Sequence, residues 1–228
     1  MTHPHGKAEK SLSDAIRDRR ATPSFLPDPV PEADLEKILA AGLAAPSAFN
    51  LQPWRFVVVR DMEQRRRLRL AAMNQPKVEE APVVLIACAD LDGWKNGEME
   101  KLIALAQAHG YGNEARYASM RKSVSRFFST EPGASGGIAP DFAVWGNRQT
   151  MIAFTTMMWM AEVLGYDTAP MEGFDEGLVK SAFAIPESVR VVALLAIGHR
   201  NGTDKAFAGR FPMAHNFFAE KWGVSIKF

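Results

Sequence analysis

The residues from Asp141 to Gly165 most limit how this chain can fold. They predict the longest helix of the protein, and the interior of that helix is apolar on nearly every side. A helix of this kind is buried all round. In a chain of 228 residues, full burial of so long a helix indicates a subunit interface, and closed homodimers are the commonest assembly. Gln149 lies near its start, and a buried glutamine must find hydrogen-bond partners.

Shorter patterns predict further helices and strands around this helix. Leu35, Ile38 and Leu39 recur at helical spacing, whereas Val83–Ala89 is continuously apolar and predicts a strand buried on both faces. Gly165 is expected to end the long helix, and residues 169–175 are expected to form a turn and a helix start whose backbone N–H groups are free to donate. The chain length is that of one domain, residues 1–228. The other expected helices cover 11–20, 31–43, 61–73 and 176–182, and the other expected strands cover 55–59 and 190–198.

Residues 91–140 predict an excursion from this core. Two helices are expected at 95–110 and 113–129, followed by a flexible connection at 131–140 that is rich in Gly, Ala, Ser and Pro. Such a segment can act as a lid over a site. Tyr117, Phe127 and Phe128 are candidates for lining a substrate pocket beneath it, and packing in the core is the alternative interpretation of all three.

Two polar segments are candidates for ligand binding. The loop from Ala44 to Phe56 presents Ser47, Asn50 and Gln52 between two prolines that stiffen the backbone, which suits a flat, partly polar ligand. An ordinary ordered loop is the alternative. Arg17, Arg19 and Arg20 cluster where the first helix ends. They are either cations favourably placed at a helix C-terminus or a guanidinium fork for a phosphate.

Charge and composition exclude several classes of function. The formal net charge of +1 gives no electrostatic reason to expect nucleic acid or an anionic membrane as a partner. The single cysteine, Cys88, allows neither an internal disulfide nor a cysteine-based metal site, and no metal is expected. The first residues lack the apolar segment of a secretory signal, and no stretch is apolar enough to span a bilayer. We therefore expect a cytoplasmic protein.

Several motifs together resemble one family. They are Arg19–Phe25 (RRATPSF), Ala45–Phe56 (APSAFNLQPWRF), Asn74–Lys77 (NQPK), Gly165–Phe174 (GYDTAPMEGF), Ile197–His199 (IGH) and Gly209–Pro212 (GRFP). In order and spacing the chain resembles the FMN-dependent nitroreductase family. The resemblance implies an α+β fold of nitroreductase type. It is a single FMN-binding domain with a mixed central β-sheet flanked by helices, to which the sequence adds the long buried helix. The resemblance runs from about Ser13 to Pro212, and the excursion at 91–140 is the part that it does not match. It also implies a homodimer with FMN at the subunit interface.

The resemblance assigns roles residue by residue. Arg19, Arg20 and Arg210 match positions that hold the FMN phosphate and ribityl chain, and Asn74 and Lys77 match positions at the polar edge of the flavin ring. Gln149 matches a position that reaches the ring or the ribityl chain. Glu172 and Gly173 match positions whose backbone N–H groups point at the flavin ring. Pro46, Ser47, Ala48 and Asn50 match positions that reach FMN from the other subunit, and Ala21, Pro170 and Met171 complete the expected FMN-binding residues. No side chain is expected to act as a general acid, because FMN carries the chemistry.

The activity implied by the resemblance is reduction of nitroaromatics, quinones or related electron-poor small molecules with NADH or NADPH, by ping-pong hydride transfer. Ala21, Pro23 and Ala208 depart from residues common in the family, and each departure removes a donor or cation near the phosphate or the ring. Two alternatives stay open. One is a flavoenzyme of the same fold with another reaction, such as dehydrogenation or flavin breakdown, and the other is a non-catalytic FMN-binding module.

Overall fold

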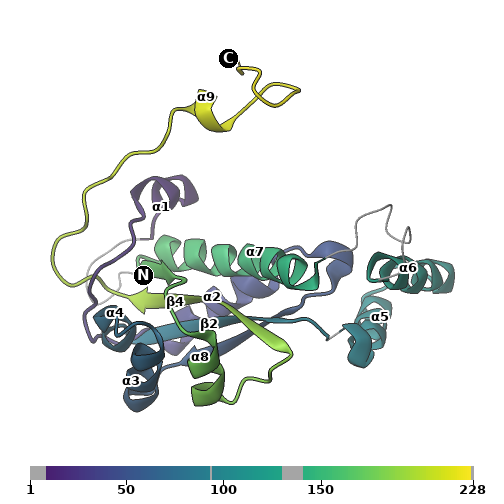
Figure 1. Cartoon of the computed structure of the whole chain (residues 1–228), viewed down its shortest axis with the longest axis horizontal. Coiled ribbons are helices and arrows are strands. Elements are labelled where there is room, and N and C mark those ends of the chain that lie inside the picture. Colours follow the sequence, from purple (N-terminus) through teal and green to yellow (C-terminus); the bar gives the residue numbers. More distant parts are fainter. Residues whose placement is uncertain (1–8, 93, 130–140, 227–228) are drawn as a thin grey trace.

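A four-stranded sheet forms the centre of the molecule (Figure 1). The computed structural model describes residues 9–92, 94–129 and 141–226. The strand order is β1-β2-β4-β3, and each neighbouring pair is antiparallel. A single parallel bridge between Ala21 and Thr168 extends the sheet beyond β3 and gives it a mixed character at that edge. The strands are β1 (Trp54–Val59), β2 (Val83–Asp90), β3 (Asp167–Met171) and β4 (Val189–Gly198).

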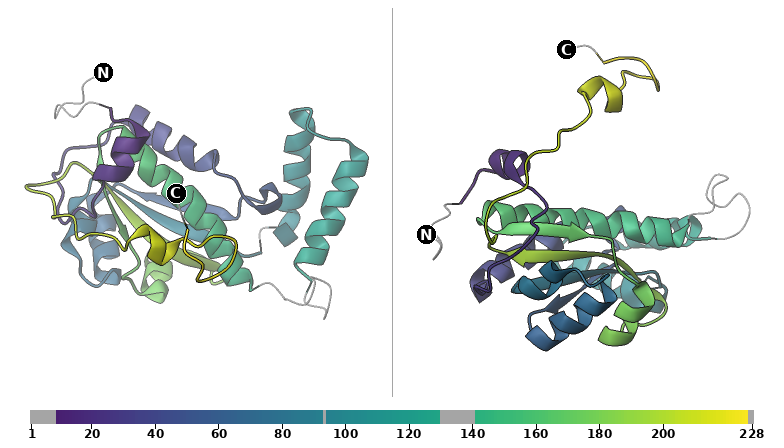
Figure 2. Two further views of the ribbon diagram at one scale, coloured as in Figure 1. Left: turned by 90° about the horizontal axis from the view of Figure 1, so that it is seen from above. Right: turned by 60° about the vertical axis from the view of Figure 1, so that its left-hand side comes forward.

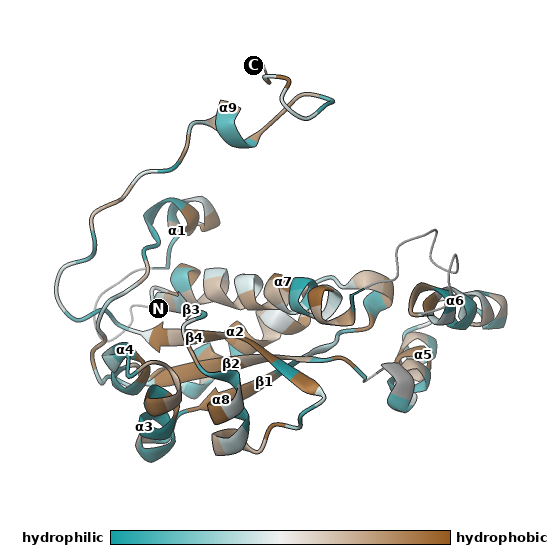
Figure 3. Ribbon diagram, viewed as in Figure 1, coloured by the Kyte–Doolittle hydropathy of each residue, from teal (hydrophilic) through white to brown (hydrophobic). Residues whose placement is uncertain are grey.

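Helices cover both faces of this sheet and bury its two central strands. On one face, α2 (Glu32–Leu43) and α7 (Phe142–Val163) pack on Val83, Leu85 and Ala87 of β2. On the other face, α3 (Met62–Ala71), α4 (Pro76–Glu80) and α8 (Glu176–Phe183) pack on the alternate residues of the same strand. The predicted doubly buried strand is confirmed, and Figure 3 shows the apolar character of the strands. The α+β architecture expected from the sequence is therefore confirmed.

The long helix α7 runs the length of the sheet, as predicted. Nine of its residues are buried within one chain, including Phe154 and Met157. Its opposite side is only partly covered: Val144 and Ile152 are exposed, and Met151, Trp159 and Met160 are half-buried. One chain thus leaves an apolar stripe of this helix open to a further contact.

Two segments differ from the sequence-based prediction. Residues 169–171 were expected to lie in a turn but belong to the edge strand β3, with Met171 opposite Leu194 of β4. Pro170 is tolerated there because an edge strand has fewer backbone N–H groups to pair than a central one. Residues 76–80, for which no helix was predicted, form the short helix α4 with Pro76 in its first turn, a position where proline needs no N–H acceptor.

The predicted excursion is a helical hairpin of α5 (Met99–Ala108) and α6 (Glu114–Phe127), which stands at one end of the sheet (Figure 2). The hairpin has a small core of its own, which packs against Trp145 at the start of α7. Tyr117 and Phe128 lie in that core, each 4% exposed, so both have a packing role. Tyr117 also borders a cavity between the hairpin and the loop before β1. The connection predicted at 131–140 lies outside the described residues.

The two ends of the described chain lie outside the three layers. Helix α1 (Leu12–Asp18) rests on the end of α7, where the Lys10 N–H donates to the Val163 carbonyl at 2.9 Å. After β4 the chain leaves the body and reaches the short helix α9 (Met213–Asn216), as Figure 1 and the right-hand view of Figure 2 show. The apolar side chains of this tail are exposed in one chain: Phe217 is 56% exposed and Trp222 is 91% exposed.

Candidate functional site

The loop between α2 and β1 is held in a strained but well-bonded conformation. Phe49, Asn50 and Gln52 adopt positive φ angles of 55°, 57° and 46°, which side-chain-bearing residues rarely adopt. The Ser47 hydroxyl accepts the Gln52 N–H at 3.0 Å, and the Gln52 amide donates back to the Asn50 side chain at 3.2 Å. Strain of this kind persists only where neighbouring contacts enforce it, and it is commonest at ligand sites. The stiff loop predicted from the two prolines is therefore present.

Gln149 ties this loop to the long helix. Its side-chain carbonyl oxygen accepts the backbone N–H of Ala48 at 2.7 Å. This bond gives the glutamine the partner that its place on an apolar helix requires. Gln149 therefore lies with four other expected site residues, Pro46, Ser47, Ala48 and Asn50, at the N-terminal end of α7. We call these five residues the loop group.

The expected phosphate residues gather at the other end of α7, where Arg19 lies beside Trp159 and Arg20 and Arg210 share Phe207. The guanidinium carbons of Arg20 and Arg210 lie 4.6 and 5.3 Å from the centre of the Phe207 ring, so one aromatic side chain holds both cations. The Arg19 guanidinium lies 6.0 Å from the Trp159 ring, and its buried Nη1 has no hydrogen-bond partner in the described part of the chain. Arg20 also donates at 2.9 Å to the carbonyls of Arg17 and Arg19, as the helix-terminus interpretation predicted.

Strand β3 anchors the arginine segment through its backbone. Ala21 forms the parallel bridge with Thr168, and the Thr22 N–H donates to the Thr168 carbonyl at 3.0 Å. The Thr168 hydroxyl in turn donates to Glu162 at 2.8 Å. Burial raises the pKa of Glu162 to about 7, although the Thr168 bond and the charges of Lys10 and Arg19 act in the opposite direction. Sequence reasoning did not single out Glu162, and the only signal was a carboxyl residue in an otherwise apolar run.

A third group of expected residues meets where α4 faces the end of β3. The Gln75 side chain, which was not predicted, donates to the Gly173 carbonyl at 2.9 Å and so joins the Asn74–Lys77 segment to Glu172 and Gly173. The Asn74 side-chain oxygen accepts from Arg69 Nε at 2.8 Å. Burial lowers the pKa of Lys77, and the nearby charge of Lys205 lowers it further. Two ammonium groups that repel each other here provide a place for an anion.

The last two expected residues of β3 have different surroundings. The Met171 side chain is buried in the core beneath the sheet. Pro170 and Glu172 border a cavity of about 270 Å³ beside Met151 and Phe154 of α7. The structure thus places the expected site residues in three groups, and in one chain the loop group and the arginines lie at opposite ends of α7.

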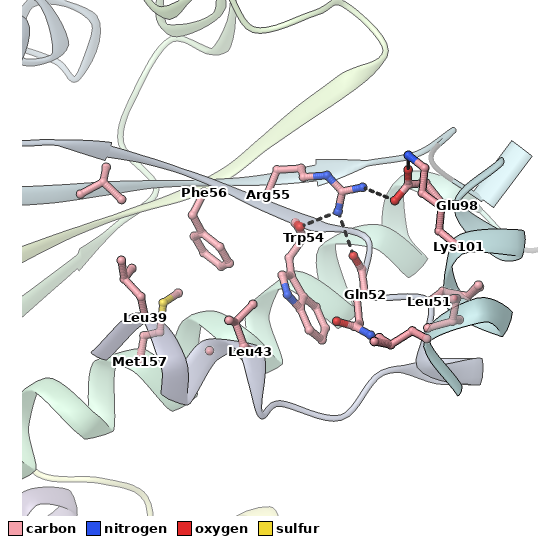
Figure 4. A pocket seen from close by; sticks show the side chains of 14 residues that line it. Leu39, Leu43, Leu51, Gln52, Trp54, Arg55, Phe56, Glu98, Lys101 and Met157 are labelled. Carbon is pink, nitrogen blue, oxygen red and sulfur yellow. Dashed lines mark hydrogen bonds and ion pairs between the residues drawn. The ribbon is translucent and has the colours of Figure 1, made fainter. Parts of the chain in front are cut away.

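A cavity of about 510 Å³ lies apart from Arg19, Arg20 and Arg210 (Figure 4). It opens between α2, the edge strand β1 and α5, and its floor is apolar: Leu39, Leu43, Trp54, Phe56 and Met157. At its rim Arg55 lies 3.5 Å from the carboxylate of Glu98. The size of the cavity does not make it the catalytic site, because it contains none of the expected cofactor residues.

The described residues contain no cluster of three or more His, Cys, Asp or Glu side chains able to hold a metal ion. Cys88 is buried in β2, and burial raises the pKa of its thiol to about 11, so it is a structural residue. Within the same described ranges, no helix combines the length and the hydropathy needed to cross a bilayer.

Comparison with known proteins identifies the family of this fold. The sequence model of the nitroreductase family, described as "Nitroreductase family", matches residues 16–199 of this chain. A Thermus thermophilus protein named NADH dehydrogenase is 38% identical over 185 residues, which are 81% of this chain and 84% of the relative. Protein DrgA of a Synechocystis species is 29% identical over 188 residues, which are 82% of this chain and 83% of the relative.

Solved structures share the fold at lower identity. A nitroreductase-fold protein of Exiguobacterium sibiricum, solved in complex with FMN, superposes with a TM-score of 0.81 at 21% identity, covering 94% of this chain and 99% of the other. A Nitroreductase Family Protein of Streptococcus pneumoniae gives a TM-score of 0.77 at 22% identity, covering 92% and 100%. Taken with the match over residues 16–199, these relationships show that the chain belongs to the nitroreductase family, a family of oxidoreductases.

Proposed function

We propose that this protein is an NAD(P)H-dependent FMN oxidoreductase that reduces nitroaromatics, quinones or related electron-poor small molecules. The observation that carries the proposal is the cationic cluster at the end of α7, where the buried Arg19 Nη1 has no hydrogen-bond partner and Arg20 and Arg210 share Phe207. A phosphate of about two negative charges fits this donor set, because guanidinium groups bind it in forked pairs. The Thermus relative named NADH dehydrogenase supports a nicotinamide reductant.

Each group of residues has its own task in this proposal. Arg19, Arg20 and Arg210 bind the phosphate and the ribityl chain. The Lys77 ammonium and the Asn74 amide lie at the polar edge of the ring, where a cation stabilises negative charge on the reduced flavin. The backbone N–H groups of Glu172 and Gly173 orient the ring. These residues bind and orient, and none of them takes part in the transfer of a proton.

Bound FMN would supply the hydride chemistry, taking reducing equivalents from NADH or NADPH and passing them to the acceptor. Both partners would use the same open face of the site in turn, so the kinetics would be ping-pong. Residues 1–228 would act as a single FMN-binding domain, with the hairpin of α5 and α6 serving as the lid.

The complete site would need two subunits, since one chain holds the loop group and the arginines at opposite ends of α7. Three apolar surfaces support a homodimer: the open stripe of α7, the exposed tail, and the cavity beside β1. The edge of β1 offers unpaired backbone groups, and the adjoining cavity offers an apolar groove. We infer that the tail of one subunit packs there on its partner.

The decisive experiment is anaerobic mixing of the purified protein with NADH and with NADPH while the flavin absorbance is followed. The expected result is a yellow protein whose flavin absorbance is lost within the dead time of mixing or shortly after it. A yellow protein that neither reductant bleaches would favour the alternative reactions or a non-catalytic module. A colourless protein that does not bind added FMN would contradict the proposal.

The phosphate assignment is tested separately by Arg210→Ala, with Arg67→Ala as the matched control on the exposed side of α3. Loss of one charge-assisted contact should weaken FMN binding by roughly tenfold to a hundredfold in the first variant, measured by flavin fluorescence titration. The control variant should bind FMN as the wild type does. Equal affinity of all three proteins would show that Arg210 does not contact the phosphate.

A further inference from the structure

A second cavity, of about 490 Å³, lies between the strained loop and the helical hairpin. Phe49 and Asn50 form one wall, and Leu102 of α5 with Tyr117 and Met120 of α6 form much of the other. This volume is within the range of pockets that bind small organic molecules. The aromatic and aliphatic lining suits a flat, apolar ligand.

Among the described residues, Arg116 is the only charged one that lines this cavity. Its guanidinium lies 4.6 Å from the centre of the Tyr111 ring and donates a hydrogen bond to the Tyr111 hydroxyl. The Tyr117 hydroxyl fixes this turn by donating to the Tyr111 carbonyl at 2.7 Å. The aromatic stack and the hydrogen bond together orient the arginine before any ligand arrives.

The backbone next to Arg116 leaves room for the aliphatic part of its side chain. Gly112 has a φ of +95°, and a Cβ at that position would lie 2.8 Å from Cδ of Arg116. The next residue, Asn113, caps α6 by accepting the Arg116 N–H at 3.0 Å. Arg116 is therefore held in the first turn of the helix, where the positive end of the backbone dipole adds to its charge.

Arg116 differs from its neighbour Arg121 in having no carboxylate partner. Arg121 pairs with Glu100 at 2.7 Å and with Glu114 at 3.1 Å, which neutralises it. Within the described ranges Arg116 forms no ion pair, and its one side-chain hydrogen bond is to Tyr111. A positioned guanidinium with unused donors in an otherwise uncharged cavity is suited to a ligand with a single negative group.

We propose that this cavity binds the electron acceptor, and that Arg116 selects flat aromatic acceptors that carry one carboxylate or similar anionic group. This inference rests on the proposed function, because the acceptor must reach FMN. Asn50 connects the two sites: it lies in the cavity wall and belongs to the loop group that the composite flavin site would use. The aromatic ring would lie against Phe49 and Tyr117, with its anionic group on Arg116.

The test compares matched acceptors on the FMN-loaded protein. Wild type, Arg116→Gln and Arg116→Lys are assayed with 4-nitrobenzoate and with 4-nitrobenzamide, and Lys122→Gln controls for loss of a positive charge on the same helix outside the cavity. In Arg116→Gln the kcat/KM for 4-nitrobenzoate should fall at least tenfold, since a charge-assisted bond is lost, while that for 4-nitrobenzamide stays within about twofold. Arg116→Lys should restore part of the preference for 4-nitrobenzoate over 4-nitrobenzamide, and Lys122→Gln should keep the whole of this preference.

A binding measurement without turnover separates this inference from the proposed function. Calorimetric titration with benzoate and benzamide, in the absence of reductant, should show tighter binding of benzoate that is lost in Arg116→Gln. If benzoate binds selectively but no acceptor is ever reduced, the anion site stands and the proposed function fails.

Two results would overturn the inference. One is an equal effect of Arg116→Gln on the charged and the neutral compounds. The other is a raised KM for NADH or NADPH with an unchanged acceptor preference, which would assign Arg116 to the phosphates of the reductant. FMN content and thermal melting curves of each variant confirm that it is folded.

Discussion

Glu162 shows how one buried carboxyl can connect the core to the arginine cluster. It is 2% exposed, it accepts the Thr168 hydroxyl, and the strand residue Thr168 pairs with the backbone of the arginine segment. A carboxyl group in such surroundings favours its neutral form, because burial penalises the charge. Lys10 and Arg19 reduce that penalty without removing it.

The raised pKa of Glu162 predicts a specific dependence of stability on pH. Between the pKa of an unfolded glutamate, near 4.5, and the native value of about 7, the native state retains a proton that the unfolded state has lost. The contribution of this group to the free energy of unfolding is therefore greatest below pH 4.5, and it decreases as the pH rises to 7. Relative to Glu162→Gln, which keeps an acceptor for Thr168, the wild type should lose about 3 kcal/mol over this window.

Urea unfolding at one fixed protein concentration, repeated from pH 4.5 to pH 8, measures this difference. Glu36→Gln on the exposed side of α2 is the matched control and should follow the wild-type profile. Parallel pH profiles of wild type and Glu162→Gln would show that the buried carboxyl does not titrate in this range.

At the scale of elements, α7 connects regions that are far apart in sequence. Its buried side packs on the sheet, its first turns carry Trp145 against the helical hairpin, and its end supports Arg19 through Trp159. Gln149 adds a polar link to the loop before β1. A movement of the hairpin or of the loop is therefore coupled mechanically to the helix that spans the molecule.

The link between α7 and the loop can be tested by removing one acceptor. In Gln149→Ala the Ala48 N–H loses its partner, and a hydrogen bond of this kind contributes about 1 kcal/mol, so amide exchange in residues 47–52 should accelerate roughly tenfold. Gln149→Glu keeps an acceptor oxygen, so the amides of residues 47–52 should exchange slowly in this variant. Hydrogen exchange followed by mass spectrometry on FMN-saturated protein measures both, with β2 as the unaffected internal reference. Unchanged exchange in Gln149→Ala would mean that the turn geometry alone holds the loop.

At the scale of the whole molecule, the exposed apolar surfaces are the most informative feature. The tail from α9 onward carries Phe217 and Trp222 into solvent in one chain, and large apolar side chains are rarely left this way in a stable monomer. The open side of α7 and the cavity beside β1 are two further apolar surfaces on the body. All three surfaces would be buried together in a symmetric dimer.

The tail therefore predicts an effect on assembly and on cofactor binding together. Trp222→Ser should weaken the dimer by about 100-fold, because a buried aromatic side chain contributes up to about 3 kcal/mol. Sedimentation velocity over a dilution series measures the assembly, and flavin absorbance of the monomer fraction measures retained FMN. The monomer should lose FMN although every residue of its own loop is intact. Leu178→Ser, at an equally apolar exposed position on α8, should remain dimeric.

The sequence alone determined the elements whose signal is local. Helical spacing, helix caps and continuous apolar runs predicted α2, α7, β2 and β4, because side-chain burial repeats with the period of the element itself. The motifs also predicted which residues form the site. The structure brings Arg20 together with Arg210, and it brings Asn74 together with Gly173 through Gln75. The role of these residues toward FMN stays a prediction.

Only the tertiary structure decided the features that depend on contacts between distant segments. Residues 167–171 become a strand because β4 offers a pairing edge, a partner that no local pattern in a segment containing Pro170 could reveal. Tyr117 and Phe128 belong to the core of the hairpin because Trp145 of α7 packs against it. Glu162 acquires its unusual pKa from burial, and Arg116 becomes a candidate anion site from the cavity around it, since both burial and shape arise from the folded arrangement rather than from the residues themselves.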